Sequence, residues 1–233
     1  MNIEQARFNM IEQQIRTWEV LDDAVLSLLS VVKREDFVPA AYKSMAFVDT
    51  EVPLPHGQSM LAPKLEARLL QELVVQRHER VLEVGAGSGY MAALLAHKAQ
   101  HVTTLEIVPE LARFAAENLQ RAWVMNATVI EADASQAPPV DGPFDVIVLS
   151  GSVAEVPRAL LGQLKPGGRL TAMVGQLPIM RAVLIMRGPA APTSGQVAVG
   201  SGRGSDPGFA TVELFDAIAP RLVGFGEPSR FTF

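Results

Sequence analysis

The chain has 233 residues, of which 48% are apolar and 19% are charged, and its formal net charge is -5. This length suits one α/β domain with a sizeable core and is short for two. The acidic balance disfavours a nucleic-acid partner, because nucleic-acid-binding domains concentrate positive charge. The lack of cysteine excludes disulfide scaffolds, cysteine-ligated zinc, iron–sulfur clusters and thiol nucleophiles.

The start of the sequence, Met1 to Gln5, has neither the basic residues nor the apolar run of a signal peptide. The longest apolar stretches, such as Met91 to Ala96, fall far below the roughly 20 residues that a membrane span needs. The four histidines are scattered without an HxxxH pair, so no metal site is predicted. We therefore expect a cytoplasmic protein without a membrane partner, and we favour a monomer.

The first 62 residues are predicted to form a helical N-terminal extension that belongs to a single domain. Apolar residues at helical spacing define one expected helix face, formed by Leu21, Ala24, Val25, Leu28, Leu29 and Val32. A weaker stripe precedes it at Phe8, Ile11, Ile15 and Trp18. Pro39 ends the part of the extension that contains these two stripes, because proline disfavours helix in the residue before it. Trp18 and Trp123 are expected to be packing residues.

From residue 63 to residue 233, helices and strands alternate. Strands are predicted at 80–84, 101–107, 127–131, 144–149, 169–174, 182–186 and 211–215, and helices from Pro63 onward, at 90–97, 109–122 and 156–164. This alternation favours parallel βαβ units with helices on both faces of one sheet. Residues 188–208 are rich in Gly, Pro and Ser and are expected to form a mobile loop, either a surface insertion or a lid.

The most informative motif is the segment Val81-Leu82-Glu83-Val84-Gly85-Ala86-Gly87-Ser88-Gly89-Tyr90. An apolar strand runs here into a glycine-rich turn and then directly into a helix. The glycines permit positive φ and close approach of a ligand to the backbone. The free N–H groups at the start of the helix face the same ligand. Open α/β sheets bind their ligands at this carboxyl edge, so the segment predicts a binding crevice.

The glycine spacing distinguishes between nucleotide ligands. Gly85, Gly87 and Gly89 follow G-x-G-x-G rather than G-x-G-x-x-G, and Glu83 stands two places before the turn, which disfavours NAD. The pattern E-x-G-x-G-x-G resembles the cofactor loop of class I S-adenosylmethionine-dependent methyltransferases. Glu106 ends the next predicted strand, where a carboxylate can accept hydrogen bonds from both ribose hydroxyls.

Two later segments extend this resemblance. Asp133-Ala134 resembles the pair that contacts the adenine, and Leu-Lys-Pro-Gly-Gly-Arg-Leu at 164–170 resembles the turn before the fifth strand. The resemblance implies S-adenosylmethionine as cofactor and a Rossmann-like α/β fold, with a mostly parallel seven-stranded sheet. The cofactor-binding residues that it predicts are Glu83, Gly85, Gly87, Gly89, Glu106, Asp133 and Ala134.

The segments that precede the glycine loop indicate which family of methyltransferases the chain resembles. Their order and spacing resemble the protein-L-isoaspartate O-methyltransferases over roughly residues 5 to 175. The segments are Arg34 to Pro39, Ala46 to Asp49, Pro53 to Pro55 and Gly57 to Pro63. The resemblance implies methylation of the α-carboxylate of L-isoaspartyl residues, after which the ester collapses to a succinimide that can reopen as normal aspartate. Protein repair is therefore the expected function.

The chain departs from the family pattern on the side of the methyl acceptor. The family usually has Gly-Gln-Thr-Ile-Ser, whereas here Ser59 takes the threonine position and Leu61 the serine position. Pro55 replaces a typical glycine. A C-terminal strand close to Phe-Val-Pro-Leu is expected, but residues 211–218 differ from it. The acceptor is thus an isoaspartyl peptide or protein or, alternatively, a small molecule; a non-catalytic cofactor-binding relative is the third hypothesis.

Ser59 and Asp49 are the predicted catalytic residues. Ser59 is expected beside the methionine part of the cofactor, and Asp49 is expected to orient either the acceptor or the cofactor's amino group. The alternatives are that Ser59 caps the helix that begins near Pro63 and that Asp49 is a solvated loop acid. Ser150 follows the fourth strand and lines the acceptor side or caps the next helix. His56 is expected to be a surface histidine rather than a base.

Overall fold

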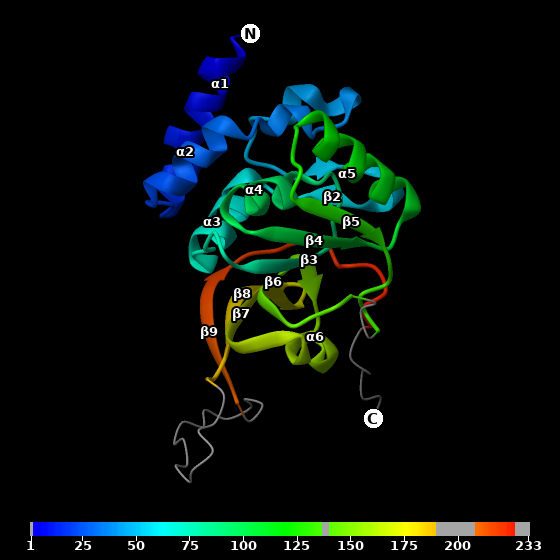
Figure 1. Cartoon of the computed structure of the whole chain (residues 1–233). Coiled ribbons are helices and arrows are strands. Elements are labelled where there is room, and N and C mark those ends of the chain that lie inside the picture. Colours follow the sequence, from blue (N-terminus) through cyan, green and yellow to red (C-terminus); the bar gives the residue numbers. More distant parts are fainter. Residues whose placement is uncertain (1, 137–139, 190–207, 227–233) are drawn as a thin grey trace.

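The computed structural model describes residues 2–136, 140–189 and 208–226 (Figure 1). The loop predicted at 188–208 therefore lies almost entirely outside the described residues, as does the end of the chain from residue 227. Within the described ranges, no helix is long and apolar enough to cross a membrane. Nor do these ranges contain a group of three or more side chains that could hold a metal ion.

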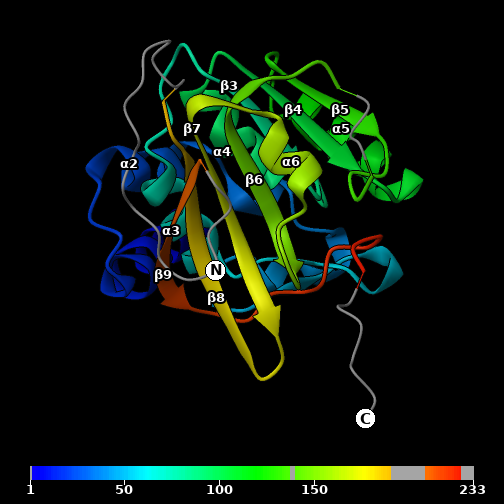
Figure 2. The ribbon, with the colours of Figure 1, turned by 90° about the horizontal axis from the view of Figure 1, so that it is seen from below.

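One seven-stranded sheet runs through the centre of the molecule, in the order β5-β4-β3-β6-β7-β8-β9 (Figure 2). The strands are β3 (Arg80–Val84), β4 (His101–Glu106), β5 (Ala127–Glu131), β6 (Phe144–Val153), β7 (Leu164–Gln176), β8 (Ile179–Arg187) and β9 (Phe209–Asp216). The pairs from β5 to β7 are parallel, and β8 and β9 join in antiparallel fashion. The predicted mostly parallel seven-stranded sheet is confirmed.

The last four strands are longer than their apolar runs predict. The register between β7 and β8 is continuous from Arg169 opposite Met186 to Gln176 opposite Ile179. Pairing with a neighbour satisfies the backbone hydrogen bonds of residues that carry no apolar signal. The length of these strands therefore depends on pairing with a neighbouring strand. The apolar pattern of a single segment carries no information about that neighbour.

The order of the strands creates the crevice that the glycine motif requires. β3 lies between β4 and β6, so the chain first builds outward through β4 and β5 and then returns to the other side of β3. At such a switch point the loops at the carboxyl ends of the strands diverge and leave room for a ligand. The turn after Val84 lies at this position.

Helices cover both faces of the sheet, as predicted. α3 (Pro63–Leu73), α4 (Tyr90–Lys98) and α5 (Pro109–Arg121) pack on one face, and α6 (Arg158–Gly162) packs on the other. Neighbouring residues of a strand contribute to different interfaces, because alternate strand residues point to opposite faces: Val81 and Val146 lie in the first, and Leu82 and Ile147 lie in the second. α6 is shorter than the helix predicted at 156–164, since Pro157 precedes it and β7 begins at Leu164.

The N-terminal extension is helical and lies over α3 and α4 (Figure 1). It comprises α1 (Ile3–Asn9), a π-helical turn (Met10–Ile15), 3-10 turns (Arg16–Trp18, Arg34–Asp36, Ala40–Met45 and Pro55–Gly57), α2 (Asp23–Val31) and the short strands β1 (Val52–Pro53) and β2 (Ser59–Met60). The buried side chains of this extension share one core with α3 and α4. The extension is therefore a continuous part of the fold.

Some packing predictions for single residues were wrong. Leu21 and Ala24 are exposed, and Leu26 is buried instead, because Asp22 caps α2 and delays its start to Asp23. Phe8 is also exposed, at 58%.

The two tryptophans have different environments. Trp18 packs edge-on against Phe215, with 6.1 Å between ring centroids. Trp123 is 84% exposed and has a positive φ of 56°, so its predicted packing role was wrong. It lies in the turn that leaves α5, where α5's own apolar side chains already cover the sheet.

Candidate active site

The glycine loop connects β3 to α4 through three glycines with positive φ. The φ angles are 91° at Gly85, 53° at Gly87 and 82° at Gly89. Gly89 is the residue before α4, and a Cβ there would lie 3.1 Å from the carbonyl oxygen of Ala115 in α5. The sequence therefore needs glycine at these positions for both backbone conformation and close packing.

Two small cavities flank this loop, each of about 30 Å³. The first is lined by Gln58, Val84, Gly85, Leu105, Glu106, Ile107, Ala132, Ala134, Leu222, Val223 and Phe225. The second is lined by Ser59, Met60, Leu61, Glu66, Glu83, Gly85, Ala86, Gly87, Ser88, Tyr90, Met91 and Ser150. A Cβ on Gly85 would meet the Leu222 side chain at 2.7 Å, so Leu222 occupies the space beside the loop. A nucleotide bound here would displace this side chain.

Glu106 lies at the end of β4 with its carboxylate against the loop. Oε2 accepts a hydrogen bond from the backbone N–H of Gly87 at 2.8 Å, and Oε1 accepts one from Val108 at 3.1 Å. The side chain is 5% exposed. The two bonds fix the carboxylate, and each oxygen retains a lone pair for a ligand hydroxyl.

Glu83 is completely buried at the end of β3. Its Oε1 accepts a hydrogen bond from the Ser150 hydroxyl at 2.6 Å. The other oxygen, Oε2, is buried without a hydrogen-bond partner among the described residues. Burial raises the pKa of Glu83 to about 8, because the charged form loses its hydration. A cation placed at Oε2 would favour the carboxylate form and lower this pKa.

The raised pKa predicts how the stability of the ligand-free protein depends on pH. The folded protein holds a proton on Glu83 up to about pH 8, whereas the unfolded chain releases it near the ordinary value of 4.5. The free energy of unfolding is therefore expected to fall as pH rises through this window. Glu66, with its pKa raised to about 7, adds a change of the same sign.

Thermal unfolding between pH 5 and pH 8 measures this slope. Glu83→Gln removes one titrating group, so the variant should show a clearly smaller loss of stability over the window. Glu117→Gln changes the same charge on the exposed surface of α5 and should leave the slope as it is. Equal slopes for wild type and Glu83→Gln would contradict the prediction.

Of the two residues predicted to contact the adenine, only Ala134 lines a cavity beside the glycine loop. Ala134 is buried and lines the cavity beside Glu106. Asp133 is exposed, and its carboxylate accepts a hydrogen bond from the backbone N–H of Ser135 at 2.8 Å. A Cβ on Gly224 would lie 3.0 Å from Asp133 Oδ1, which places the C-terminal segment against this acid at the rim of the cavity.

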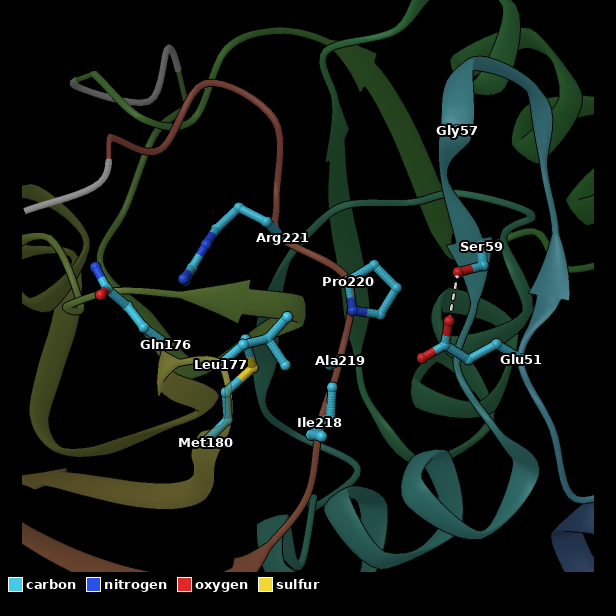
Figure 3. A pocket seen from close by; sticks show the side chains of 10 residues that line it. All are labelled: Glu51, Gly57, Ser59, Gln176, Leu177, Met180, Ile218, Ala219, Pro220 and Arg221. Atoms are coloured by element: carbon cyan, nitrogen blue, oxygen red, sulfur yellow. Dashed lines mark hydrogen bonds between the residues drawn. The ribbon is translucent and has the colours of Figure 1, made fainter.

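A larger pocket, of about 520 Å³, lies between the β1–β2 hairpin, the turn from β7 to β8 and the segment 218–221 (Figure 3). It is lined by Glu51, Gly57, Ser59, Gln176, Leu177, Met180, Ile218, Ala219, Pro220 and Arg221. Ser59 lines both this pocket and the cavity that contains Glu83. The Ser59 hydroxyl donates a hydrogen bond to Glu51 Oε2 at 2.9 Å. The pocket and the cavity therefore share Ser59 as a lining residue. We call the larger one the acceptor pocket, after the acceptor-side motif of the sequence to which Ser59 belongs.

Asp49 is held by an ion pair rather than directed into the acceptor pocket. Its Oδ2 lies 2.7 Å from Lys64 Nζ, and Lys64 lies over the ring of Trp18 at 4.3 Å from the centroid. The role of Asp49 in orienting an acceptor stays a prediction. His56 lies 2.6 Å from Glu110, and both side chains are about half exposed or more, as expected of a surface histidine.

Sequence reasoning missed a buried ion pair under the site. Arg34 and Glu66 form a salt bridge with side chains 0% and 5% exposed, and Arg34 Nη2 donates to the carbonyl oxygen of Leu61 at 2.8 Å. The Leu61 side chain is itself buried and lines the cavity that contains Glu83. The apolar spacing of α3 indicated its buried face but not that Glu66 belongs to it.

The C-terminal side of the acceptor pocket comes from the segment that follows β9. The strand predicted at 211–215 is present as β9, whereas residues Ile218 to Arg221 line the pocket, and Arg221 bridges to Ser152 of β6. The signal for this was present, since Pro220 stands third in Ile-Ala-Pro-Arg as proline does in Phe-Val-Pro-Leu. One proline in a short segment is a weak signal, and the sheet contact decides the register.

Comparison with known proteins agrees with this geometry. The model of the protein-L-isoaspartate(D-aspartate) O-methyltransferase family matches residues 5–188. The chain belongs to this family. The family pattern covers the N-terminal extension, the glycine loop and the sheet as far as β8. The segment 218–221 lies beyond the match, although it lines the acceptor pocket.

Individual members of the family are similar over most of their length. The protein-L-isoaspartate O-methyltransferase of Methanoculleus marisnigri is 40% identical over 169 residues, which cover 72% of this chain and 77% of the relative. The enzyme of that name from Koribacter versatilis is 38% identical, and the matched region covers 78% of this chain and 81% of the relative. A Plasmodium falciparum structure assigned to the family, solved with S-adenosyl-L-homocysteine, superposes with a TM-score of 0.74 at 24% identity, covering 95% and 98%. The fold is thus that of the family.

Proposed function

We propose that the protein transfers the methyl group of S-adenosylmethionine to the α-carboxylate of L-isoaspartyl residues in damaged proteins. The observation that carries this proposal is the junction at Ser59, where the acceptor pocket meets the cavity beside the glycine loop. A methyl donor in one volume and an acceptor in the other would face each other there. Membership of the family supports the choice of both substrates.

The residues around the glycine loop fit this cofactor. S-adenosylmethionine supplies a methyl group activated by its attachment to a sulfonium. Glu83 Oε2, buried without a partner in the described structure, suits the cationic end of its methionine part. The fixed carboxylate of Glu106 suits the two ribose hydroxyls, and the backbone of Gly85 allows close approach once Leu222 has moved. Ala134, with Asp133 at the rim, would border the adenine.

The acceptor side has to position its substrate rather than deprotonate it. A carboxylate with an ordinary pKa near 4 is already ionised at neutral pH and needs no general base. Transfer requires an acceptor oxygen held at roughly 3–3.5 Å from the methyl carbon and in line with the departing sulfur. Ser59 lies at the junction that this oxygen would reach, but in the ligand-free structure its hydroxyl proton is donated to Glu51, so Ser59 would border the acceptor without donating to it. Asp49 would position the segment that leads to Glu51. Leu61 offers only apolar surface there.

The chemistry of the product tests the proposal. A protein aged at neutral pH to accumulate isoaspartate is incubated with the enzyme and methyl-labelled S-adenosylmethionine. A carboxyl methyl ester releases its label as methanol in mild base, and this is the expected result. Label that survives base would indicate an ether or N-methyl product. That outcome would favour the alternative of a small-molecule or other acceptor, for which Leu61 in place of a serine is the specific observation.

Isoaspartyl-containing peptides and proteins are accordingly the proposed partners, met in the cytoplasm by a monomeric enzyme. The segment 218–221 lines the acceptor pocket, and Ile218 in this segment is 54% exposed, which suits a peptide chain that continues past the methylated residue.

A further inference from the structure

Glu51 is a half-buried carboxylate in the wall of the acceptor pocket. It directly precedes β1, and its Oε2 accepts the hydrogen bond from Ser59. No salt bridge involves Glu51 within the described residues. Two other acids of the neighbourhood do have basic partners, since Asp49 pairs with Lys64 at 2.7 Å and Glu110 with His56 at 2.6 Å. In the part of the chain that the structure describes, the negative charge of Glu51 is therefore not balanced by an ion pair.

This charge lies close to the point of methyl transfer. Ser59 belongs to both binding volumes, and Glu51 is one hydrogen bond of 2.9 Å from it. Figure 3 shows Glu51 and Ser59 on one side of the pocket and Arg221 and Gln176 on the other, with Pro220 between them. The Arg221 side chain is directed toward Gln176 and away from Glu51, and its Nη2 donates a hydrogen bond to the carbonyl oxygen of Gly175 at 2.9 Å.

The hydrogen bond also determines what Ser59 offers to an acceptor. Because the hydroxyl proton is donated to Glu51, the Ser59 oxygen presents lone pairs to the pocket. An acceptor carboxylate near Ser59 therefore meets a second carboxylate and no hydroxyl proton. Like charges at short range in a partly buried site repel strongly, because the local dielectric is lower than that of water. A cation carried by the acceptor itself would remove this repulsion.

We propose that Glu51 selects acceptors that carry a positive charge beside the methylated carboxylate, namely isoaspartyl segments with a neighbouring lysine or arginine side chain. The inference rests on the proposed function and adds its preference among isoaspartyl sites. The basic side chain pairs with Glu51, while the carboxylate to be methylated lies at Ser59. Acceptors with acidic neighbours are disfavoured for two reasons. They have no basic side chain to pair with Glu51, and their own negative charge adds to the repulsion.

The test compares three isoaspartyl peptides that are identical except for lysine, alanine or glutamate on both sides of the isoaspartate. For the wild-type protein, kcat/KM should be at least about fivefold higher for the lysine peptide than for the glutamate peptide, which corresponds to the upper range of an exposed ion pair. The difference should lie mainly in KM. It should shrink at high salt.

Three variants separate charge from structure. Glu51→Gln keeps an oxygen that can accept the Ser59 hydrogen bond but removes the charge, so it should lower the lysine preference to near unity and improve the glutamate peptide. Glu51→Lys should reverse the preference. Glu117→Gln removes the same charge from the exposed surface of α5 and should behave as wild type.

The possible outcomes distinguish a failure of the proposed role of Glu51 from a failure of the proposed function. Methylation of all three peptides with equal kcat/KM, or a preference that Glu51→Gln and Glu51→Lys leave unchanged, would overturn the role of Glu51 and leave the proposed function standing. No methylation of any isoaspartyl peptide by wild type, with S-adenosylmethionine binding confirmed by calorimetry in the same sample, would overturn both.

Discussion

Glu106→Ala is expected to weaken S-adenosylmethionine binding at least tenfold, and about a hundredfold if both ribose hydroxyls lose their acceptor. A hydrogen bond to a charged group contributes about 1.5–3 kcal/mol, and one such bond already accounts for the lower limit. The variant also leaves the N–H groups of Gly87 and Val108 without the bonds that they make at 2.8 and 3.1 Å. The variant would therefore lose the hydrogen bond that holds the glycine loop as well as the contact with the ribose. Isothermal calorimetry measures the affinity directly.

Glu131→Ala is the matched control for this experiment. Glu131 ends β5 directly opposite Glu106 in the parallel register, but its side chain is exposed. Its removal changes the same charge at the next strand end and should leave the affinity close to that of wild type. Unchanged affinity in Glu106→Ala, or equal losses in both variants, would show that the ribose does not bind at Glu106.

Gly89→Ala is expected to cost about 2–5 kcal/mol of folding free energy. An L-residue at the φ of 82° costs roughly 1–2 kcal/mol. In addition, the new Cβ would lie 3.1 Å from the carbonyl oxygen and 3.3 Å from the Cα of Ala115, and overpacking of this kind costs about 1–3 kcal/mol. Because these neighbours are backbone atoms of α5, they cannot rotate away. Denaturant unfolding of the two proteins gives the difference.

Gly167→Ala separates the two causes. Gly167 has a similar φ of 80°, but a Cβ there would meet nothing within 4 Å. It should therefore lose only the roughly 1–2 kcal/mol of backbone strain and bind the cofactor normally. Gly89→Ala should also bind S-adenosylmethionine more weakly, since the start of α4 and the glycine loop shift together. Equal stability losses for the two variants would contradict the close packing of α4 on α5.

The parts of the site that the sequence predicted are those encoded within one βα unit. Gly85, Gly87 and Gly89 stand between an apolar strand and a helix, and the structure gives all three a positive φ. Glu83 and Glu106 end neighbouring strands, so parallel pairing alone brings them to one edge. Local spacing and a general rule of sheet topology were sufficient here.

The parts that could not be predicted depend on contacts between distant segments. Glu51, Ser59 and Arg221 come together only through the β1–β2 hairpin and the segment after β9. The burial of Glu66 depends on Arg34, 32 residues earlier in the chain. Leu21 and Trp123 carry apolar side chains that the pattern placed in the core, yet the core is complete without them. A one-dimensional pattern records none of these relations.

The measurement that tests the central claim most directly is methyl transfer to an isoaspartyl peptide beside its aspartyl twin, with S-adenosylmethionine labelled in the methyl group. The twin has the same composition and charge but lacks the free α-carboxylate at that residue. We predict label in the isoaspartyl peptide only, lost as methanol in mild base. Equal label in both peptides, or none in either while the protein binds S-adenosylmethionine, would contradict the assignment of the acceptor pocket to isoaspartyl residues.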